Sequence, residues 1–264
     1  MKKLPPITLE KFVSHFKAER KIDLAEQLRV YHAILESIQP RAFSPFYWII
    51  ADNHTMKLED VSDTVAQLTP FSKEEWLASD AAFYSNQFHP EDRYYTIAAF
   101  QQASILFADM DELARKHSSF NFYTRMLDKN NKYRWVLIQT MLQFINDDKQ
   151  LESSLSVTYD LSNFSITSLP LLSIIDSSNN EITYYKYEEK EIRQIYIEPI
   201  HITSREKEIL QLMARGLNTP EISEQLFISY HTVENHKRNL RKKTDSKTSA
   251  ALIAYAITHN VLAL

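Results

Sequence analysis

Long polar side chains recur along one face of a helix that the sequence predicts near the end of the chain. Their spacing places them together on one side of that helix: His231, Glu234, Asn235, Arg238, Arg241 and Lys242. The amide of Asn235 can pair with adenine, and the guanidinium of Arg238 can pair with guanine. Lys237, Arg241, Lys242 and Lys243 suit backbone phosphates instead. This face therefore offers the chemistry needed to recognise double-stranded DNA.

Glu234 does not suit a surface that only neutralises phosphate. Its carboxylate repels phosphate, so we expect it on the floor of a groove, accepting from cytosine, or beside an arginine that it orders. The alternative for the whole face is the solvated, charged surface of an ordinary helix. The complete set predicted to bind DNA is Thr232, Glu234, Asn235, Lys237, Arg238, Arg241 and Lys242.

Capping residues mark the starts of three predicted helices, and they are Thr203, Asn218 and Ser229. A glutamate follows each of the first two caps by three residues, which completes a capping box. Gly216 is the only glycine in the chain, and it stands where the first helix needs a left-handed residue to end. Val233, His236 and Leu240 line the face of the third helix that we expect to pack inward. The short turn before Ser229 predicts a helix-turn-helix.

The C-terminal segment closely resembles the LuxR-type (GerE-like) helix-turn-helix. The matching stretches are ITSREKEIL (202–210), ARGL (214–217), EIS (221–223), ISYHTVENH (228–236), RNL (238–240) and AYAI (254–257). The resemblance implies a four-helix module that binds DNA as a homodimer, with the helix at about 249–259 at the dimer contact. Four positions depart from the family pattern: Thr219-Pro220 replaces Asn-Lys, Thr244 replaces leucine, and Glu234 occupies a position that is often basic.

Length and composition indicate a cytoplasmic protein of two domains. The chain has 264 residues and no cysteine, which excludes disulfides, thiolate metal sites and cysteine chemistry. The N-terminus lacks the apolar stretch of a signal peptide, and the apolar runs are too short to cross a membrane. The net charge of −4 is uneven, because residues 200–264 carry +3 and the preceding residues carry −7. A basic C-terminal domain fits a nucleic-acid partner, although +3 is also an ordinary surface.

The segment 44–165 alternates predicted strands and helices, and it contains the stretches FSKEEW (71–76), HPEDR (89–93), KYRWV (132–136) and YDLS (159–162). In these stretches and in their order the segment resembles a PAS sensor domain. Ser72 and Glu75 form a capping pair, and a long helical segment is predicted from 89 to about 116. Asn130-Asn131 stands where the family turn has glycine, and asparagine tolerates the same left-handed backbone. The predicted fold class is α+β, an antiparallel sheet with helices followed by an all-α domain.

The resemblance to PAS domains implies a pocket or a protein-contact surface that biases the DNA-binding domain between two arrangements. The ligand is unknown, and no cofactor or metal is predicted. His89 is a candidate haem ligand, but it is better interpreted as a cap or packing residue of the His-Pro turn. We assign the aromatic residues Phe120, Phe122, Tyr123 and Trp135 to the core rather than to a pocket wall.

Two further segments flank the PAS-like region. Residues 1–43 are predicted as helices, and within 24–38 a repeat of Leu24, Leu28, Tyr31, Leu35 and Ile38 has coiled-coil spacing. This seam is either a second dimer contact or a face packed on its own domain. Residues 166–200 are predicted as a hairpin, 171–176 with 181–187, and a charged connector at 188–191. The DNA-binding domain is assigned to 201–264.

The sequence favours a sequence-specific transcription regulator, which is not an enzyme. Its predicted partners are double-stranded DNA, a second copy of the chain and, as a candidate, RNA polymerase, with no membrane partner. One alternative is an interaction scaffold, in which the PAS-like domain docks a partner protein and the C-terminal segment mainly dimerises. An enzyme is the other alternative, but no catalytic triad, metal cluster or glycine-rich phosphate loop supports it.

Overall fold

The computed structural model describes residues 8–38, 42–164, 172–188, 191–195 and 202–258, and these fall into two compact units. The first unit extends through the last strand, β8, and the second begins with α8. Among the helices of the described residues, none is long and apolar enough to cross a membrane. The two units are considered separately below.

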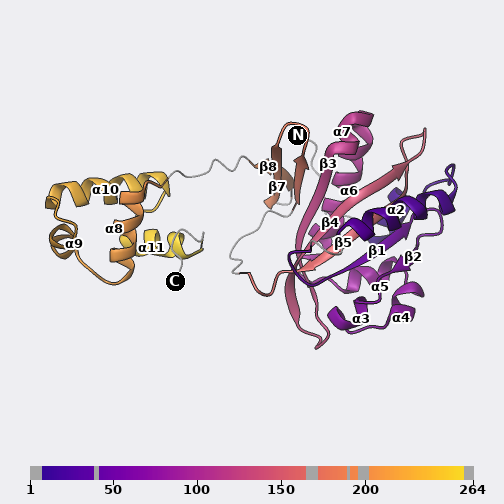
Figure 1. Ribbon diagram of the computed structural model, residues 1–264, viewed down its shortest axis with the longest axis horizontal. Coiled ribbons are helices and arrows are strands. Elements are labelled where there is room, and N and C mark those ends of the chain that lie inside the picture. The colour runs from indigo at the N-terminus through magenta and orange to yellow at the C-terminus, as the bar shows by residue number, and fades with distance from the viewer. Residues whose placement is uncertain (1–7, 39–41, 165–171, 189–190, 196–201, 259–264) are drawn as a thin grey trace. The chain divides into compact units, whose positions relative to one another are not determined.

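The first unit is built on one antiparallel sheet of eight strands in the order β2-β1-β5-β4-β3-β6-β7-β8 (Figure 1). The strands are β1 (Phe46–Asp52), β2 (Lys57–Val61), β3 (Ser118–Leu127), β4 (Tyr133–Ile145), β5 (Leu151–Asp160), β6 (Leu172–Asp176), β7 (Glu181–Glu188) and β8 (Glu191–Ile195). Asn131 has φ +59°, so the β3–β4 turn uses the left-handed backbone predicted for its asparagine. This arrangement confirms the predicted antiparallel sheet with helices.

Alternating side chains give the sheet two apolar faces. In β1, Tyr47 and Ile49 point to one face, whereas Ile50 points to the other. The first face is covered by α3 (Val65–Leu68), α4 (Lys73–Leu77), α5 (Ala81–Asn86) and α6 (Arg93–Asp109). Trp76 of α4 is fully buried there, and its indole nitrogen donates to the Thr69 hydroxyl at 3.0 Å. The main core of the unit therefore lies between the sheet and these short helices.

Helix α2 (Leu24–Ile38) covers the opposite face of the sheet (Figure 1). Tyr31 is fully buried, and its hydroxyl lies 2.7 Å from the hydroxyl of Ser153 in β5. Leu35 packs in the same cluster as Ile50 and Leu155. Tyr31 and Leu35, at the centre of the predicted coiled-coil seam, therefore pack against the sheet of the same chain. This agrees with the interpretation that the seam is a face packed on its own domain.

Two parts of the first unit differ from the sequence expectation. The long helix predicted from 89 to 116 is two helices, because Asp111 caps a new helix, α7 (Glu112–His117), by accepting from the Ala114 amide at 2.8 Å. The hairpin β6–β7 also continues the sheet, with Phe120 of β3 opposite Ile174 of β6. Of the predicted charged connector at 188–191, Glu188 lies in β7 and Glu191 in β8, which pairs with β7, and residues 189–190 lie outside the described residues. The local sequence pattern does not reveal which strands pair when they are far apart in the chain.

The second unit consists of four helices around one small core. The helices are α8 (Ser204–Ala214), α9 (Thr219–Gln225), α10 (Tyr230–Lys243) and α11 (Ser249–Thr258). Each contributes side chains that are almost or fully buried, among them Ile209 and Leu210 of α8, Ile222 of α9, and Leu252 of α11. This confirms the predicted all-α domain of four helices within the described residues.

Candidate nucleic-acid interface

Helices α9 and α10 form a helix-turn-helix whose ends are fixed by local hydrogen bonds. Asn218 accepts from the Glu221 amide at 3.1 Å, and the Glu221 carboxylate accepts from the Asn218 amide at 2.7 Å. Ser229 caps α10 by accepting from the Thr232 amide at 3.1 Å. Thr203 and Glu206 form the same reciprocal box at the start of α8. All of the predicted caps are therefore confirmed.

Gly216 ends α8 as predicted. Its φ is +92°, and its amide donates to the Met213 carbonyl at 3.0 Å, while the Leu217 amide donates to the Leu212 carbonyl at 3.1 Å. These two bonds satisfy carbonyls that the helix end leaves open. The result is a sharp change of chain direction between α8 and α9.

The turn between α9 and α10 uses a second left-handed residue, which the sequence did not reveal. Phe227 has φ +53°, and its side chain is 94% exposed. The Ile228 amide donates to the Ser223 carbonyl at 3.1 Å, which closes the turn. A non-glycine residue in this conformation costs about 1 kcal/mol or more, and the hydrogen bonds of the turn offset that cost.

The inner face of α10 is anchored by two fully buried residues, Val233 and Leu240. His236, which was predicted to pack inward with them, is only half-buried and lies at the edge of that face. Thr244 follows the helix at a position where leucine is usual in the family. It is buried, and its hydroxyl donates to the Leu240 carbonyl at 2.8 Å, which satisfies its polar atom.

The outer face of α10 carries the residues predicted to bind DNA. Asn235, Arg238 and Lys242 are exposed, and Arg241 is half-buried. Arg238 donates from Nη2 to Oδ1 of Asn235 at 2.8 Å, which holds the two side chains side by side. The other N–H groups of the guanidinium and the amide nitrogen of Asn235 stay available for base edges. Thr232 contributes to the start of the helix, where its hydroxyl lies 2.8 Å from that of Ser229.

Glu234 and Lys237 belong to a small polar cluster with Thr219 of α9. The Thr219 hydroxyl donates to Oε1 of Glu234 at 2.6 Å, and Nζ of Lys237 donates to the same hydroxyl at 2.8 Å and to Glu234 at 3.1 Å. The hydrogen bond from Thr219, together with Lys237, lowers the pKa of Glu234. Glu234 therefore orders a lysine rather than an arginine, and the unusual Thr219 is its partner.

A second ion pair joins the far end of α10 to α8. Nζ of Lys243 donates to Oε2 of Glu206 at 2.6 Å, and the Glu206 side chain is only 4% exposed. Burial alone raises the pKa of Glu206, but the hydrogen bonds from Lys243 and Thr203 outweigh burial and lower it. The same glutamate thus completes a capping box and fixes α10. The sequence indicated the first role and gave no signal for the second.

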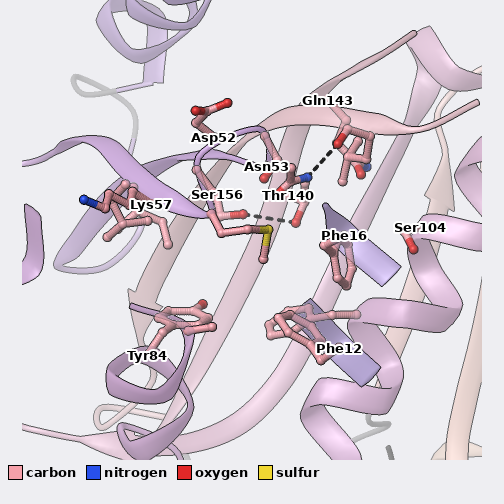
Figure 2. A pocket seen from close by; sticks show the side chains of 18 of the residues that line it. Phe12, Phe16, Asp52, Asn53, Lys57, Tyr84, Ser104, Thr140, Gln143 and Ser156 are labelled. Carbon is pink, nitrogen blue, oxygen red and sulfur yellow. Dashed lines mark hydrogen bonds between the residues drawn. The ribbon is translucent and has the colours of Figure 1, made fainter. Parts of the chain in front are cut away.

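The first unit contains a cavity of about 140 Å³ that is a candidate site for a signal (Figure 2). Its walls come from the sheet, α5 and α6 and from α1 (Leu9–Phe16). Phe120 and Phe122 belong to the core and also line this cavity, so the assignment of both to the core alone was incomplete. Tyr123 and Trp135 are not among the lining residues.

His89 lies away from that cavity. Its Nδ1 accepts from the Glu91 amide at 3.2 Å, and its ring packs edge-on against Tyr133 at 4.6 Å between ring centroids. The first contact lies within the His-Pro turn, and the second packs that turn against β4. Within the described residues, no group of three or more His, Asp or Glu side chains is arranged to hold a metal ion.

Comparisons with known proteins match both units to families. Residues 201–256 match the luxR family of bacterial regulatory proteins, and residues 58–157 match the PAS fold. The transcriptional regulatory protein MctR of Rhizobium johnstonii is 43% identical over 61 residues, which are 23% of this chain and 28% of MctR. The oxygen regulatory protein NreC of Staphylococcus carnosus is 42% identical over 66 residues, 25% of this chain and 30% of NreC. The chain therefore spans less than a third of the length of these relatives.

Among solved structures, the VqmA dimer of Vibrio cholerae, described as a LuxR-type receptor, matches 85% of this chain and 87% of its own. The identity is 17% and the TM-score is 0.32, which does not establish a shared arrangement of the whole chains. The family matches rest on the two segments themselves. The chain therefore joins a segment that matches the PAS fold to a C-terminal helix-turn-helix segment that matches the luxR family of bacterial regulatory proteins.

Proposed function

We propose that this protein is a sequence-specific DNA-binding transcription regulator in which α10 reads the major groove. The observation that carries the proposal is the two-sided character of α10. Val233 and Leu240 are fully buried on one side, while Asn235 and Arg238 are exposed and hydrogen-bonded to each other on the other. A rigidly held pair of amide and guanidinium groups is what direct readout of base edges requires.

The seven predicted residues divide by role in this proposal. Asn235 and Arg238 contact bases, and Arg241 and Lys242 contact phosphates. Thr232 and Glu234 position the helix, and Lys237 is held by Glu234 and Thr219, at the edge of the DNA contact. The relatives matched over the same domain carry the names of regulatory proteins, which favours this interpretation over an enzyme.

We further propose that the protein acts as a homodimer in the cytoplasm, with α11 as the dimer contact. Leu252 and Ala256 of α11 are buried in the domain core, and Ala250 and Ala251 are exposed. A dimer reads two half-sites about 10 base pairs apart or a multiple of that spacing. RNA polymerase is a candidate partner of the DNA-bound dimer. The segment 44–165 receives the signal and shifts the DNA-binding segment 201–264 between two arrangements.

The test is selection of a binding site from random DNA, followed by fluorescence anisotropy on the selected and on unrelated DNA. A regulator binds the selected duplex more tightly than unrelated DNA, and its affinity falls steeply with salt. A scaffold that only dimerises gives no enriched sequence and no salt-dependent binding. Titration of the DNA at saturating protein then gives the stoichiometry. A complex of one chain on a single half-site contradicts the dimer.

A further inference from the structure

The size of the cavity in the first unit limits what it can hold. Its volume of about 140 Å³ is close to that of an apolar protein cavity of roughly 150 Å³ known to hold benzene. The rings of Phe100 and Phe122 and the side chain of Ile49 supply apolar walls. A molecule with one ring therefore fits, and a multi-ring cofactor does not.

The charged residues that line the cavity are committed elsewhere. Asp52 is buried and is bound by Arg20 at 2.6 Å and by the hydroxyl of Thr55 at 2.6 Å. Asp80 caps α5 by accepting from the Phe83 amide. Lys57 is exposed at the rim, and Figure 2 shows its ammonium pointing away from the rings of the cavity. Because an unpaired buried charge is strongly unfavourable, the cavity selects an uncharged molecule.

Several polar side chains that line the cavity have no hydrogen bond within the described part of the chain, and Tyr84 is one of them, with Ser79, Gln143 and Ser154. Burial raises the pKa of the Tyr84 hydroxyl. It therefore stays protonated and can donate to an acceptor on a bound molecule. The hydroxyls of Thr140 and Ser156, on the sheet side, lie 3.2 Å from each other. These groups suit a ring that carries a neutral hydrogen-bonding substituent.

Helix α1 forms one wall of the cavity, and it lies outside the segment that matches the PAS fold. Phe12 and Phe16 line the cavity with ring centroids 4.6 Å apart, and Figure 2 shows both rings bordering the same space as Tyr84. None of the residues of α1 is buried. Its polar tether to α6 is the ring of His15, with Nε2 2.8 Å from the Ser104 hydroxyl.

The segment after α1 is held much more firmly. The Ala18 amide donates to the Asn53 carbonyl at 3.1 Å, and Arg20 pairs with Asp52. The carboxylate of Glu152, which is 1% exposed, accepts from the Lys21 amide at 2.7 Å. Helix α1 is therefore fixed at its C-terminal end and weakly attached along its length, as a hinged cover requires.

We propose that the cavity binds an uncharged, single-ring molecule and that α1 is a cover held closed by that molecule. This inference deepens the sensing role in the proposed function and rests on it. A bound ring adds contacts to Phe12 and Phe16, so binding and closure strengthen each other. The chain then has two states, with α1 docked or undocked, whose balance the bound molecule sets.

Benzamide and benzoate provide a matched pair of probes for the whole chain, since they share one ring and differ in charge. Binding is measured by calorimetry, and closure by amide hydrogen exchange over residues 9–16. Benzamide is expected to bind and to slow exchange in α1, whereas benzoate at the same concentration does neither. Equal binding of both probes, or binding of neither, overturns the ligand assignment.

The double variant Phe12→Ala/Phe16→Ala tests the cover, with Phe43→Ala as the control. Phe43 is an exposed phenylalanine of the same unit that does not line the cavity. The double variant should weaken benzamide binding at least tenfold, and the control should leave it unchanged. Unchanged binding in the double variant, or unchanged exchange in α1 on binding, overturns the cover.

Tyr84→Phe keeps the ring, so it tests the pocket even where the double variant does not fold. Loss of one neutral hydrogen bond should weaken benzamide binding by about two- to thirteenfold and leave toluene binding unchanged. An equal effect on both probes contradicts the role of the hydroxyl. These experiments contain no DNA. Failure of the cavity proposal therefore leaves the DNA-binding proposal intact, and loss of selective DNA binding leaves the cavity results standing.

Discussion

Replacement of Arg238 by alanine is the sharpest test of the recognition helix. Its side chain is exposed on α10, and its hydrogen bond to Asn235 is the one contact that the described structure gives its guanidinium. Loss of an exposed side chain of this kind changes the free energy of unfolding by no more than about 0.5 kcal/mol. The variant should therefore fold as the parent does, and any change in binding reports on DNA contact.

The expected loss follows from the contact that the guanidinium can make. A bidentate contact to guanine contributes about 1–3 kcal/mol of discrimination. A dimer makes the contact twice, so the free-energy difference between the correct and the altered site falls by about 2–6 kcal/mol. Asn235 also loses the partner that orients its amide, which adds to the loss at the neighbouring base.

The assay compares two duplexes of equal length, the selected site and the same site with its guanines replaced. The ratio of the two dissociation constants is measured by fluorescence anisotropy at one fixed salt concentration. Arg215→Ala is the matched control, since it removes the same charge from an exposed position outside α10. If Arg238→Ala keeps the parent ratio, the assignment of base contacts to this helix face is wrong.

Three further predictions concern phosphate contact, the buried ion pair and the glycine. Arg241→Ala and Lys242→Ala should each weaken binding to all DNA sequences alike. In a dimer each should reduce the steepness of log affinity against log salt concentration by about 1.8. A change in the ratio of the dissociation constants for selected and unrelated DNA contradicts this. Glu206→Gln should cost about 1–3 kcal/mol in urea unfolding at pH 7, because it weakens the charged bond to Lys243. Because the pKa of Glu206 is lower in the folded protein, the stabilisation by its carboxylate is fully present above about pH 4.5 and is lost as the pH falls through the pKa of the folded state. The unfolding free energies of parent and variant should therefore converge in acid. Gly216→Ala should lower the free energy of unfolding of the second unit by about 1–2 kcal/mol, because the backbone at this residue has φ +92°. An added Cβ would meet no atom within 4 Å, so backbone strain is the whole effect. Arg215→Ala, at a residue with φ −79°, is the control.

The features that the sequence predicted correctly are those set by neighbours along the chain. The caps at Thr203, Asn218 and Ser229 bond to amides three residues away, and Gly216 meets a local backbone requirement. The pairing of β6 with β3 joins residues about fifty positions apart, and no local pattern specifies that register. Phe227 was missed because asparagine and glycine, not phenylalanine, are the usual signals for its backbone.

The interface shows the same division between local and distant contacts. Exposure of Asn235 and Arg238 followed from helical spacing, and so did burial of Val233 and Leu240. The cluster of Thr219 with Glu234 and Lys237 did not, since it joins residues of two helices. The resemblance to PAS domains implied a pocket or a protein-contact surface, but the lining of the cavity was not predicted, because Phe12 and Phe16 lie more than a hundred residues before Phe120 and Phe122.

The Thr219 cluster bears on how this interface divides its binding energy. A domain with the family's usual lysine at position 220 and a basic residue at position 234 would present two more cations than this one. Here Pro220 and Glu234 occupy those positions, and Lys237 is drawn to Glu234. Phosphate contact supplies affinity that is independent of sequence, whereas base contact supplies selectivity. Fewer free cations therefore lower binding to unrelated DNA more than binding to the correct site. We therefore propose that the departures from the family pattern favour selectivity over raw affinity, with Arg238 and Asn235 carrying a correspondingly larger share of the binding.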